Sequence, residues 1–478
     1  MRSRTQRSVA MIMAAGLIFA ACGSDDDATG DDATTEEAAE PEAEADAEAE
    51  PDAEAEAPAG EGLATEGSVE IAAGTTLNLD ECPDDWDATR GITDDEIILG
   101  MSLPQSGPLA AFGDIGAGME AYFAYLNDTD PIDGKQIELI LADDAYEAGR
   151  TSANVQEMID SDEVFALTHI IGTGNNLAAR PITDDACVPQ LFNSTGFPLW
   201  GDPANFPWTI GNILNYETET AIWCTDMNER FPDGATVAAL INNNDFGKTY
   251  QNALQNCDGI EVIAEQLHAQ DAPDIANEMT TLIASGADVL IGGTTGAYCP
   301  QAAAALAGSD WRPVFYNSYT CNNLSSFYAP VEEAIGVLGE SAPILANSNK
   351  ICGDPTFDGD PAVEEIKTIL ADYGDTTCEA GSFSTGVLYG QIVEDVLRPA
   401  AAMPGGLNRV NLMSAVWNMD ATNDTLLGGS FKADGVNDTF ITESAQLQRV
   451  VVGENGLTFE AVGDAIDVEG QGGSYVAP

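Results

Sequence analysis

Residues 96–128, EIILGMSLPQSGPLAAFGDIGAGMEAYFAYLND, constrain the fold most, because they combine a strand pattern, a turn and a helix pattern in one short stretch. Residues 97–99 are a β-branched and apolar run, which the proline and glycines at 104–113 cannot continue. Apolar residues then recur at helical spacing: Ile115, Met119, Tyr122, Phe123 and Leu126. This order predicts a βαβ unit. Ligands of open α/β sheets bind outside the carboxyl ends of the strands, so we expect a small molecule at 105–112.

The same alternation of strand and helix patterns continues along the chain. We predict strands at 135–142, 164–169, 189–194, 235–242, 260–266, 287–292 and 313–317. We predict helices at 150–159, 172–186, 218–228, 249–257, 276–284, 300–307, 363–373 and 386–403. Segments 446–452 and 457–461 predict a terminal hairpin. Two consecutive sets of this pattern predict two doubly wound α/β lobes with parallel sheets covered on both faces.

The charge of the chain excludes one class of partner. Its 478 residues, enough for two domains, contain 16 lysines and arginines against 80 acidic residues, a formal net charge of −64. Such a surface repels nucleic acid and anionic lipid headgroups, so we expect no nucleic-acid partner. Solubility or adaptation to salty surroundings accounts for the charge; a specific cationic partner is the alternative.

The N-terminus has the form of an export signal. Arg2, Arg4 and Arg7 precede an apolar run that is short for a membrane span, so we predict a signal peptide at 1–21. The apolar run ends in the sequence Phe-Ala-Ala-Cys, which resembles a bacterial lipobox. The resemblance implies that Cys22 is diacylated and anchors the exported protein to the outer face of the cytoplasmic membrane. An ordinary signal peptide with an incidental cysteine is the alternative.

Residues 22–67 are predicted to be this lipid anchor followed by a disordered acidic tether. Residues 23–67 contain 18 acids and no lysine or arginine, with alternating alanine and glutamate and three prolines. Like charges four residues apart repel each other, and no apolar face is present to bury, so we do not expect a stable helix.

Cysteine usage agrees with export. Apart from Cys22, eight cysteines remain: Cys82, Cys187, Cys224, Cys257, Cys299, Cys321, Cys352 and Cys378. An even number outside the cytoplasm predicts disulfides, with free buried thiols as the alternative. Pairing sequence neighbours predicts 224–257, 299–321 and 352–378, which leaves 82–187. The spacing lacks the paired CxxC form of a zinc site and only two histidines are present, so we expect no metal.

Several of these segments, taken in order, resemble one known family. The turn SLPQSGPLAAFG, the following GKQIELILADDAYEAGRT and the later VPQLFNSTGFP, FGKTY and ADVLIGG resemble the type I periplasmic-binding-protein family, specifically the branched-chain amino acid (Leu/Ile/Val) receptors of ABC importers. The likeness covers 92–390 in unbroken order. It implies two doubly wound parallel-sheet lobes joined by a hinge that the chain crosses three times. Lobe 1 would comprise 90–210 and 345–425, and lobe 2 would comprise 211–344 and 426–465.

The same resemblance implies a ligand site lined by strand-end loops of both lobes. Its first-lobe residues would be Phe112, Thr173, Ser194 and Gly196, and its other residues would be Phe246, Thr294, Tyr319 and Phe383. An aromatic wall from Phe112 and Phe246 would suit an apolar side chain, although either ring would serve equally well as core.

Three polar segments each have a functional and a structural interpretation. Thr173 and the backbone N–H groups after it open a helix, an arrangement suited to a carboxylate, but Thr173, Asn175 or Asn176 would also simply cap that helix. The double aspartate at 143–144 is either a turn with a helix cap or a metal site. The sequence DPTFDGD at 354–360 lacks calcium-loop spacing and is interpreted as a turn.

The chain departs from the family at two of these positions. The family's amino-acid receptors usually supply a threonine hydroxyl where this chain has Gly196, and a carboxylate for the ligand ammonium where it has Tyr319. Loss of both would leave a buried ammonium without compensation. A carboxylate without an amine, an amide or another small polar molecule therefore fits at least as well as an α-amino acid.

The sequence gives no sign of an enzyme. It lacks a G-x-S-x-G elbow, metal-spaced histidines and a phosphate loop with lysine, so we expect neither catalysis nor a cofactor. The resemblance implies a monomeric, lipid-anchored receptor that closes over one small ligand and delivers it to ABC permease subunits. The alternative is a surface lipoprotein that senses a ligand and signals to a membrane partner.

Overall fold

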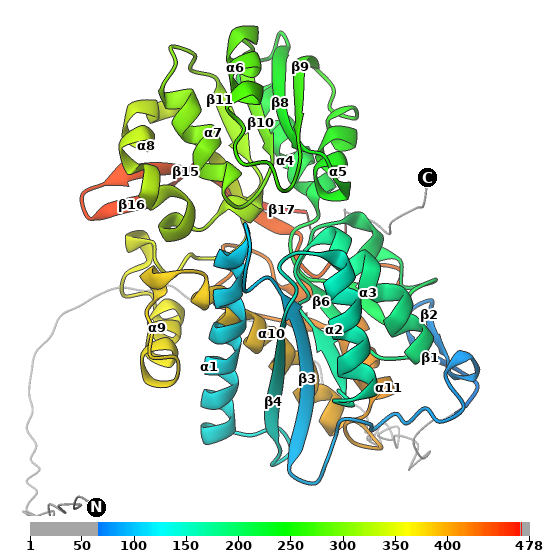
Figure 1. Ribbon diagram of the computed structural model, residues 1–478. Helices are drawn as coiled ribbons and strands as arrows, with labels where there is room; N and C mark the ends of the chain where they lie inside the picture. Colours follow the sequence, from blue (N-terminus) through cyan, green and yellow to red (C-terminus); the bar gives the residue numbers. More distant parts are fainter. Residues whose placement is uncertain (1–65, 469, 471–478) are drawn as a thin grey trace, which may run out of the picture. The chain divides into compact units, whose positions relative to one another are not determined.

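The computed structural model describes residues 66–468 and 470. The predicted signal peptide, Cys22 and the tether up to residue 65 lie outside the described residues. The described chain forms two large, mostly parallel sheets with helices on their faces (Figure 1). The predicted α/β class is therefore confirmed.

The first large sheet has five strands in the order β4-β3-β5-β6-β7, all paired in parallel. They are β3 (Glu96–Leu103), β4 (Gln136–Asp143), β5 (Ala166–Thr168), β6 (Gln190–Asn193) and β7 (Thr209–Gly211). Strand β3 is buried on both faces. Ile97, Leu99 and Met101 belong to the core on one face, whereas a side chain at Gly100 would meet Met158 on the other. This explains why the strand is apolar without alternation.

The helices that pack on the first large sheet cover both of its faces. They are α1 (Asp114–Thr129), α2 (Ala148–Asp160), α3 (Thr173–Ala186), α9 (Pro361–Tyr373), α10 (Phe383–Ala402) and α11 (Arg409–Trp417). Helices α1 and α10 lie side by side although far apart in sequence (Figure 1). Glycines allow this close approach, because a Cβ at Gly118 would overlap the carbonyl of Phe383, and a Cβ at Gly386 would overlap that of Ile115.

The second large sheet is parallel in its centre and antiparallel at one edge. Its path runs β16-β15-β12-β11-β10-β8-β9, with β17 also paired to β15. The strands are β8 (Ala235–Asn242), β9 (Ile260–His268), β10 (Val289–Gly293), β11 (Val314–Asn317), β12 (Ile344–Asn347), β15 (Ser444–Gly453), β16 (Gly456–Ala461) and β17 (Ile466–Asp467). The antiparallel pair of β15 and β16 is the predicted terminal hairpin.

Helices also cover the second sheet on both faces, giving it two separate cores. They are α4 (Tyr216–Arg230), α5 (Asp245–Leu254), α6 (Ala276–Ser285), α7 (Tyr298–Ala307) and α8 (Glu332–Leu338). The prediction of a helix at 249–257 was wrong at its start. The Asn244 side chain accepts a hydrogen bond from the Gly247 N–H at 3.0 Å, so the helix begins four residues earlier.

The chain passes three times between the two large sheets: from β7 to α4, from β12 to α9, and from β14 (Phe431–Lys432) to β15. Two of the crossing segments are bonded to each other, and the third is bonded to the segment that precedes β14. The Thr442 hydroxyl donates to the Asn212 carbonyl at 2.7 Å, and the Leu427 N–H donates to the Ser348 carbonyl at 2.8 Å. The boundaries predicted for the two lobes remain a prediction.

A short hairpin of β1 (Ser68–Ala72) and β2 (Thr75–Asn78) precedes the first large sheet and was not predicted. It packs on α11, where the Asn418 side chain donates to the Ile71 carbonyl at 2.8 Å. A second small pair joins β13 (Asp420–Ala421) to β14.

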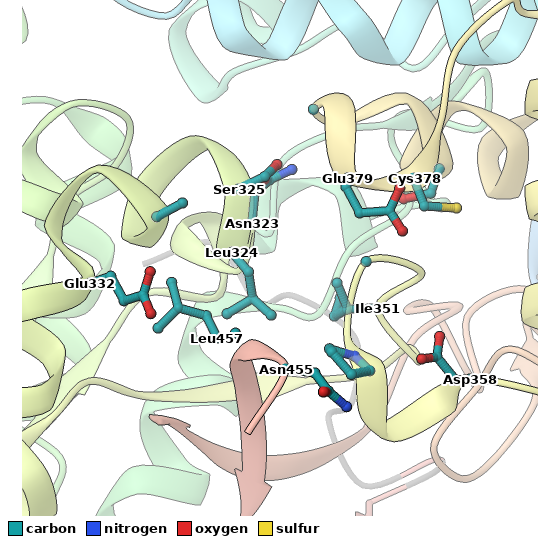
Figure 2. Close-up of a pocket in the computed structure, with 16 residues that line it drawn as sticks. Asn323, Leu324, Ser325, Glu332, Ile351, Asp358, Cys378, Glu379, Asn455 and Leu457 are labelled. Atoms are coloured by element: carbon teal, nitrogen blue, oxygen red, sulfur yellow. The ribbon is translucent and has the colours of Figure 1, made fainter. Parts of the chain in front are cut away.

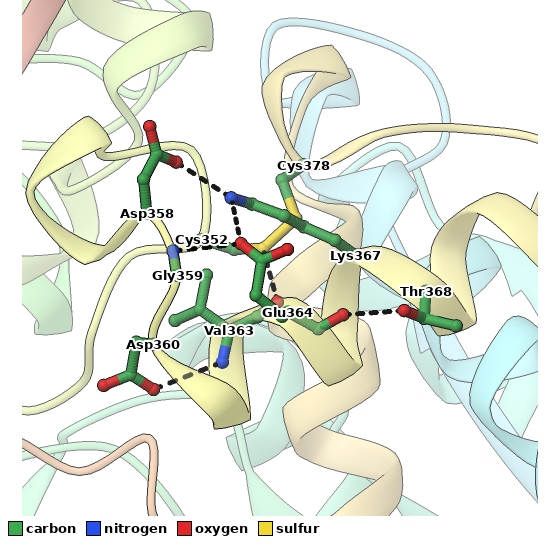
Figure 3. Close-up of a disulfide and its surroundings, with 9 residues drawn as sticks. All are labelled: Cys352, Asp358, Gly359, Asp360, Val363, Glu364, Lys367, Thr368 and Cys378. Atoms are coloured by element: carbon green, nitrogen blue, oxygen red, sulfur yellow. Dashed lines mark hydrogen bonds and ion pairs between the residues drawn. A yellow bond between two sulfur atoms is a disulfide. The ribbon is translucent and has the colours of Figure 1, made fainter.

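All four predicted disulfide pairings are present: Cys82–Cys187, Cys224–Cys257, Cys299–Cys321 and Cys352–Cys378. Figure 3 shows the last of these beside α9, where Lys367 forms ion pairs with Asp358 at 2.9 Å and with Glu364 at 2.8 Å. The segment 354–360, predicted as a turn, contains a 3₁₀ helix at Pro355–Phe357 followed by a turn. Its last residue, Asp360, caps α9 by accepting from the Ala362 N–H at 3.0 Å.

Candidate functional site

A small cavity of about 80 Å³ lies at the carboxyl ends of strands from both large sheets. From the first sheet, it is reached by the segments that follow β3, β4, β5, β6 and β7, and from the second by those that follow β8, β10 and β11. Helix α10 contributes the remaining wall. The lining residues used below are Phe112, Tyr146, Gly172, Ser194, Tyr216, Phe246, Tyr319, Thr320, Asn322, Asn323, Ser382, Thr385 and Tyr389. This position agrees with the rule for open α/β sheets.

The wall of this cavity carries no side chain that is charged near neutral pH. Its seventeen residues include no lysine, arginine, histidine, aspartate or glutamate. Six are aromatic: Phe112, Tyr146, Tyr216, Phe246, Tyr319 and Tyr389. Hydroxyl and amide groups supply the polar contacts. Burial raises the pKa of the tyrosine hydroxyls, so they remain neutral donors and acceptors.

Four of the eight predicted site residues line the cavity: Phe112, Ser194, Phe246 and Tyr319. The two phenylalanines also pack against neighbouring rings. Phe112 meets Phe327 edge-on at 5.9 Å, and Phe246 meets Tyr216 edge-on at 5.1 Å. Each ring therefore belongs both to the cavity wall and to the adjoining core.

The other four predicted residues lie outside the lining. The hydroxyl of Thr173 is bonded to that of Thr195 at 2.6 Å, and the hydroxyl of Thr294 to His268 Nε2 at 2.8 Å. The carbonyl of Gly196 accepts from the Tyr216 N–H at 2.8 Å. Phe383 begins α10 and packs against the core between this helix and the first large sheet. None of these four residues lines the cavity, and their role in ligand binding stays a prediction.

Sequence reasoning missed several lining residues, and two are instructive. Tyr146 follows the end of β4 and fits the strand-end rule that predicted residues 105–112. Tyr389 lies inside α10, far from any strand end in sequence. Its hydroxyl is 2.7 Å from Ser194 Oγ, and its ring stacks on His169 at 4.0 Å. No local pattern identifies it.

The N-terminus of α3 borders the cavity at Gly172, whose φ of 102° favours glycine. No side chain caps this helix. Asn176 donates to the carbonyls of Ile170 and Gly172, and Asn175 donates to Asp144 and Thr151, so the predicted alternative of a side-chain cap is wrong. The first N–H groups of α3 and its positive dipole end are suited to a carboxylate.

The double aspartate organises the loops around this end of the first sheet. Asp143 accepts from the N–H of Gln105 at 2.8 Å, and Asp144 accepts from the N–H of Tyr146 at 2.8 Å. Asp144 is fully buried, and burial raises the pKa of its carboxyl despite four hydrogen bonds. Among residues 66–468 and 470, no cluster of histidine, cysteine or acidic side chains is arranged to hold a metal ion.

Behind Tyr319 lies a second buried acid, Glu219 of α4, which has no exposed surface. One carboxyl oxygen accepts from the Tyr319 N–H at 2.6 Å and the other from the Tyr250 hydroxyl at 2.5 Å. Burial raises the pKa of Glu219 to about 8, although both hydrogen bonds act to lower it. Burial therefore favours the protonated form of this acid.

A larger hollow of about 460 Å³ adjoins the cavity at Asn323 (Figure 2). It lies among loops and the β15–β16 turn, away from the strand ends, and acidic side chains such as Glu332 and Glu379 surround it. We assign the site to the smaller cavity, because only there do strand ends, aromatic rings and a helix N-terminus meet.

None of the helices in the described part of the chain has the length and apolar character that a membrane crossing requires.

Comparison with known proteins gives one family and many similar folds. Residues 96–438 match the family model described as periplasmic binding protein. No curated protein sequence matches the chain significantly.

Three solved structures illustrate the similarity of fold. A branched-chain amino acid ABC transporter protein from Thermus thermophilus with bound valine has a TM-score of 0.66 and 17% identity, covering 79% of this chain and 97% of that one. A solute-binding protein from R. palustris in complex with 4-hydroxybenzoate has a TM-score of 0.65 and 16% identity, covering 78% and 97%. A possible leucine/isoleucine/valine-binding protein from Rhodopirellula baltica SH 1 has a TM-score of 0.62 and 18% identity, covering 80% and 98%.

Proposed function

Because the chain belongs to the periplasmic binding protein family, we propose that it is an extracytoplasmic lipoprotein that binds one small ligand and delivers it to an ABC importer. Cys22 would carry the lipid, and the acidic tether would hold the folded part away from the membrane. The observation that carries the proposal is the cavity with an uncharged wall at the strand ends of both large sheets.

The wall also indicates which chemical groups the ligand carries. A carboxylate or amide oxygen would accept from the first N–H groups of α3 beside Gly172 and from the Ser194–Tyr389 hydroxyl pair. The six rings would surround an apolar body. The wall holds no carboxylate for an ammonium, which would therefore be buried without a charged partner. We propose a small carboxylate without an amine, or an amide, as the ligand.

Closure over the ligand requires no chemistry. Residues from both large sheets meet in one cavity, so a bound molecule would contact both lobes only when they are closed. Those contacts favour the closed state by the difference in ligand affinity between the two states. A permease that recognises only the closed form would then distinguish loaded from empty receptor.

A thermal-shift screen tests this proposal. The panel contains valine, 4-hydroxybenzoate, 3-methylbutanoate, its amide, polyols and nucleosides. A ligand that binds only the folded state raises the melting temperature. At a hundredfold excess over Kd, it adds about 2.7 kcal/mol to the free energy of unfolding. We expect carboxylates and amides to stabilise the protein, and a panel without any stabiliser would contradict the proposal.

Two matched tyrosine variants locate the site. Y389F removes a hydroxyl from the cavity wall, whereas Y373F removes one that bonds Asp128 at 3.0 Å on the exposed side of α9. We expect Y389F to reduce the ligand-induced shift and Y373F to leave it unchanged. Equal shifts in both variants would place the ligand elsewhere.

A further inference from the structure

Four side chains form one hydrogen-bonded chain from a buried acid to the cavity. The Glu219 carboxyl lies 2.5 Å from the Tyr250 hydroxyl, which lies 2.8 Å from Ser318 Oγ. Ser318 Oγ lies 2.9 Å from the hydroxyl of Thr320, a cavity-lining residue. Ser318 Oγ also accepts from the Thr320 N–H at 3.2 Å.

The buried end of this chain has no positive partner. The titratable groups that face Glu219 are Tyr216 on its own helix, Tyr250 on α5 and Tyr319 after β11. All three are phenols whose pKa burial raises, so they are neutral beside the acid. The only group in the cluster that changes charge near neutral pH is the Glu219 carboxyl.

Each hydroxyl in such a chain both donates and accepts, so the carboxyl at its end sets the direction of every bond. When Glu219 is protonated, it donates to Tyr250, Tyr250 donates to Ser318, and Ser318 donates to Thr320. The Thr320 proton is then free to point into the cavity. When Glu219 is ionised, its carboxylate accepts from Tyr250, and every other bond in the chain reverses as well. Thr320 then donates its proton to Ser318 and presents only lone pairs to the cavity.

We propose that Glu219 and Thr320 determine ligand specificity together, with the proton on Glu219 deciding whether Thr320 offers a ligand a donor or an acceptor. The inference rests on the proposed function, because it requires that the cavity holds the ligand. Protonated Glu219 favours a carboxylate or carbonyl oxygen beside Thr320. Ionised Glu219 disfavours an anionic ligand twice, through the reversed hydroxyl and through a new buried negative charge.

The binding test uses the full chain in detergent with 3-methylbutanoate and 4-hydroxybenzoate as probes, titrated calorimetrically from pH 6 to pH 9. The carboxylates of both probes stay ionised over this range. In E219Q, the amide accepts from Tyr319 and permanently donates to Tyr250, and so imitates the protonated acid. T320V removes the terminal hydroxyl without changing the side-chain shape. E229Q, at an exposed glutamate on the same helix, is the control.

We expect the affinity of the wild type for whichever probe binds to fall by about fivefold to tenfold between pH 6 and pH 9, because the protonated fraction of a carboxyl with a pKa of about 8 falls to about a tenth at pH 9. E219Q should keep the low-pH affinity throughout, T320V should bind weakly with little pH dependence, and E229Q should follow the wild type. A wild type without pH dependence, or an E219Q variant that retains it, would overturn the inference.

A measurement without ligand tests the proton on Glu219 separately from the proposed binding function. Infrared difference spectra of wild type and E219Q at pH 6.5 report the carbonyl band of a protonated carboxylic acid. We expect the band in wild type and its loss in E219Q; an ionised Glu219 at pH 6.5 would refute the inference whichever ligand binds. If no probe binds, the proposed function fails and the specificity role fails with it, while the band still reports whether the buried proton is present.

Discussion

At the scale of single residues, Gly196 shows how backbone packing limits the chemistry of the site. A Cβ at this position would overlap the Leu214 carbonyl oxygen and lie 2.7 Å from the Tyr216 ring. Both neighbours are fixed, because Tyr216 donates its N–H to the Gly196 carbonyl and begins α4. A threonine hydroxyl therefore has no room here.

We expect G196A to destabilise the protein by about 1–3 kcal/mol, because an added methyl group must displace backbone atoms. The matched control is G149A in α2, where a Cβ would meet no atom within 4 Å. That change should stabilise the protein by about 0.5–1 kcal/mol, since alanine has less backbone freedom to lose. Urea denaturation measures the free energy of unfolding of both variants. An unchanged free energy of unfolding in G196A would show that the packing around residue 196 leaves room for a side chain.

The raised pKa of Glu219 predicts how stability depends on pH. A carboxyl with a pKa of about 8 in the folded state and about 4.5 in the unfolded state binds more protons when folded. Its contribution is therefore fully present below pH 4.5 and is lost as the pH rises toward 8. We expect E219Q to gain stability relative to wild type across this range, with E229Q showing no such gain. A constant difference between E219Q and wild type would contradict the assignment.

At the scale of elements, the disulfides join segments that lie far apart in the chain. Cys82–Cys187 closes a sequence separation of 105 residues and holds the segment that follows the β1–β2 hairpin, whereas Cys299–Cys321 closes only 22. In the chain-entropy description, the longer loop removes more disorder from the unfolded state.

We expect C82A/C187A to cost about 4–5 kcal/mol and C299A/C321A about 3 kcal/mol, following the loop lengths. Denaturation of both double variants under oxidising conditions measures the difference. If the shorter loop were the costlier one to open, local packing around Cys299 and Cys321, both fully buried, would outweigh chain entropy.

Most elements were predictable because the parallel strands are buried on both faces and the helices between them have one apolar side. Helix α11 was missed for a physical reason: seven of its nine residues are buried, including Arg409, so its sequence shows no polar face. Arg409 donates to the carbonyls of Val164 and Phe165, a contact 244 residues or more away in sequence. Tyr389 likewise enters the site only because α10 packs on α1.

At the scale of the whole molecule, charge acts on stability rather than on the site. The formal net charge of −64 repels itself more strongly in the compact state than in the unfolded chain, whereas the cavity wall is neutral. We expect the melting temperature to rise with sodium chloride from low concentration to about 0.5 M, as the ions screen the surface. A melting temperature that falls with salt would mean that ion pairs such as Lys350–Asp360 outweigh the repulsion.

The central claim is that the cavity takes a carboxylate or amide but not an ammonium. Calorimetric titration of the same protein with 3-methylbutanoate and with valine tests it directly, because the two molecules share one carbon skeleton and differ in the amine. The uncharged wall predicts that 3-methylbutanoate binds at least about tenfold tighter, since the ammonium of valine would be desolvated without a partner. Tighter binding of valine would contradict the account and would require a carboxylate that the described cavity wall does not contain.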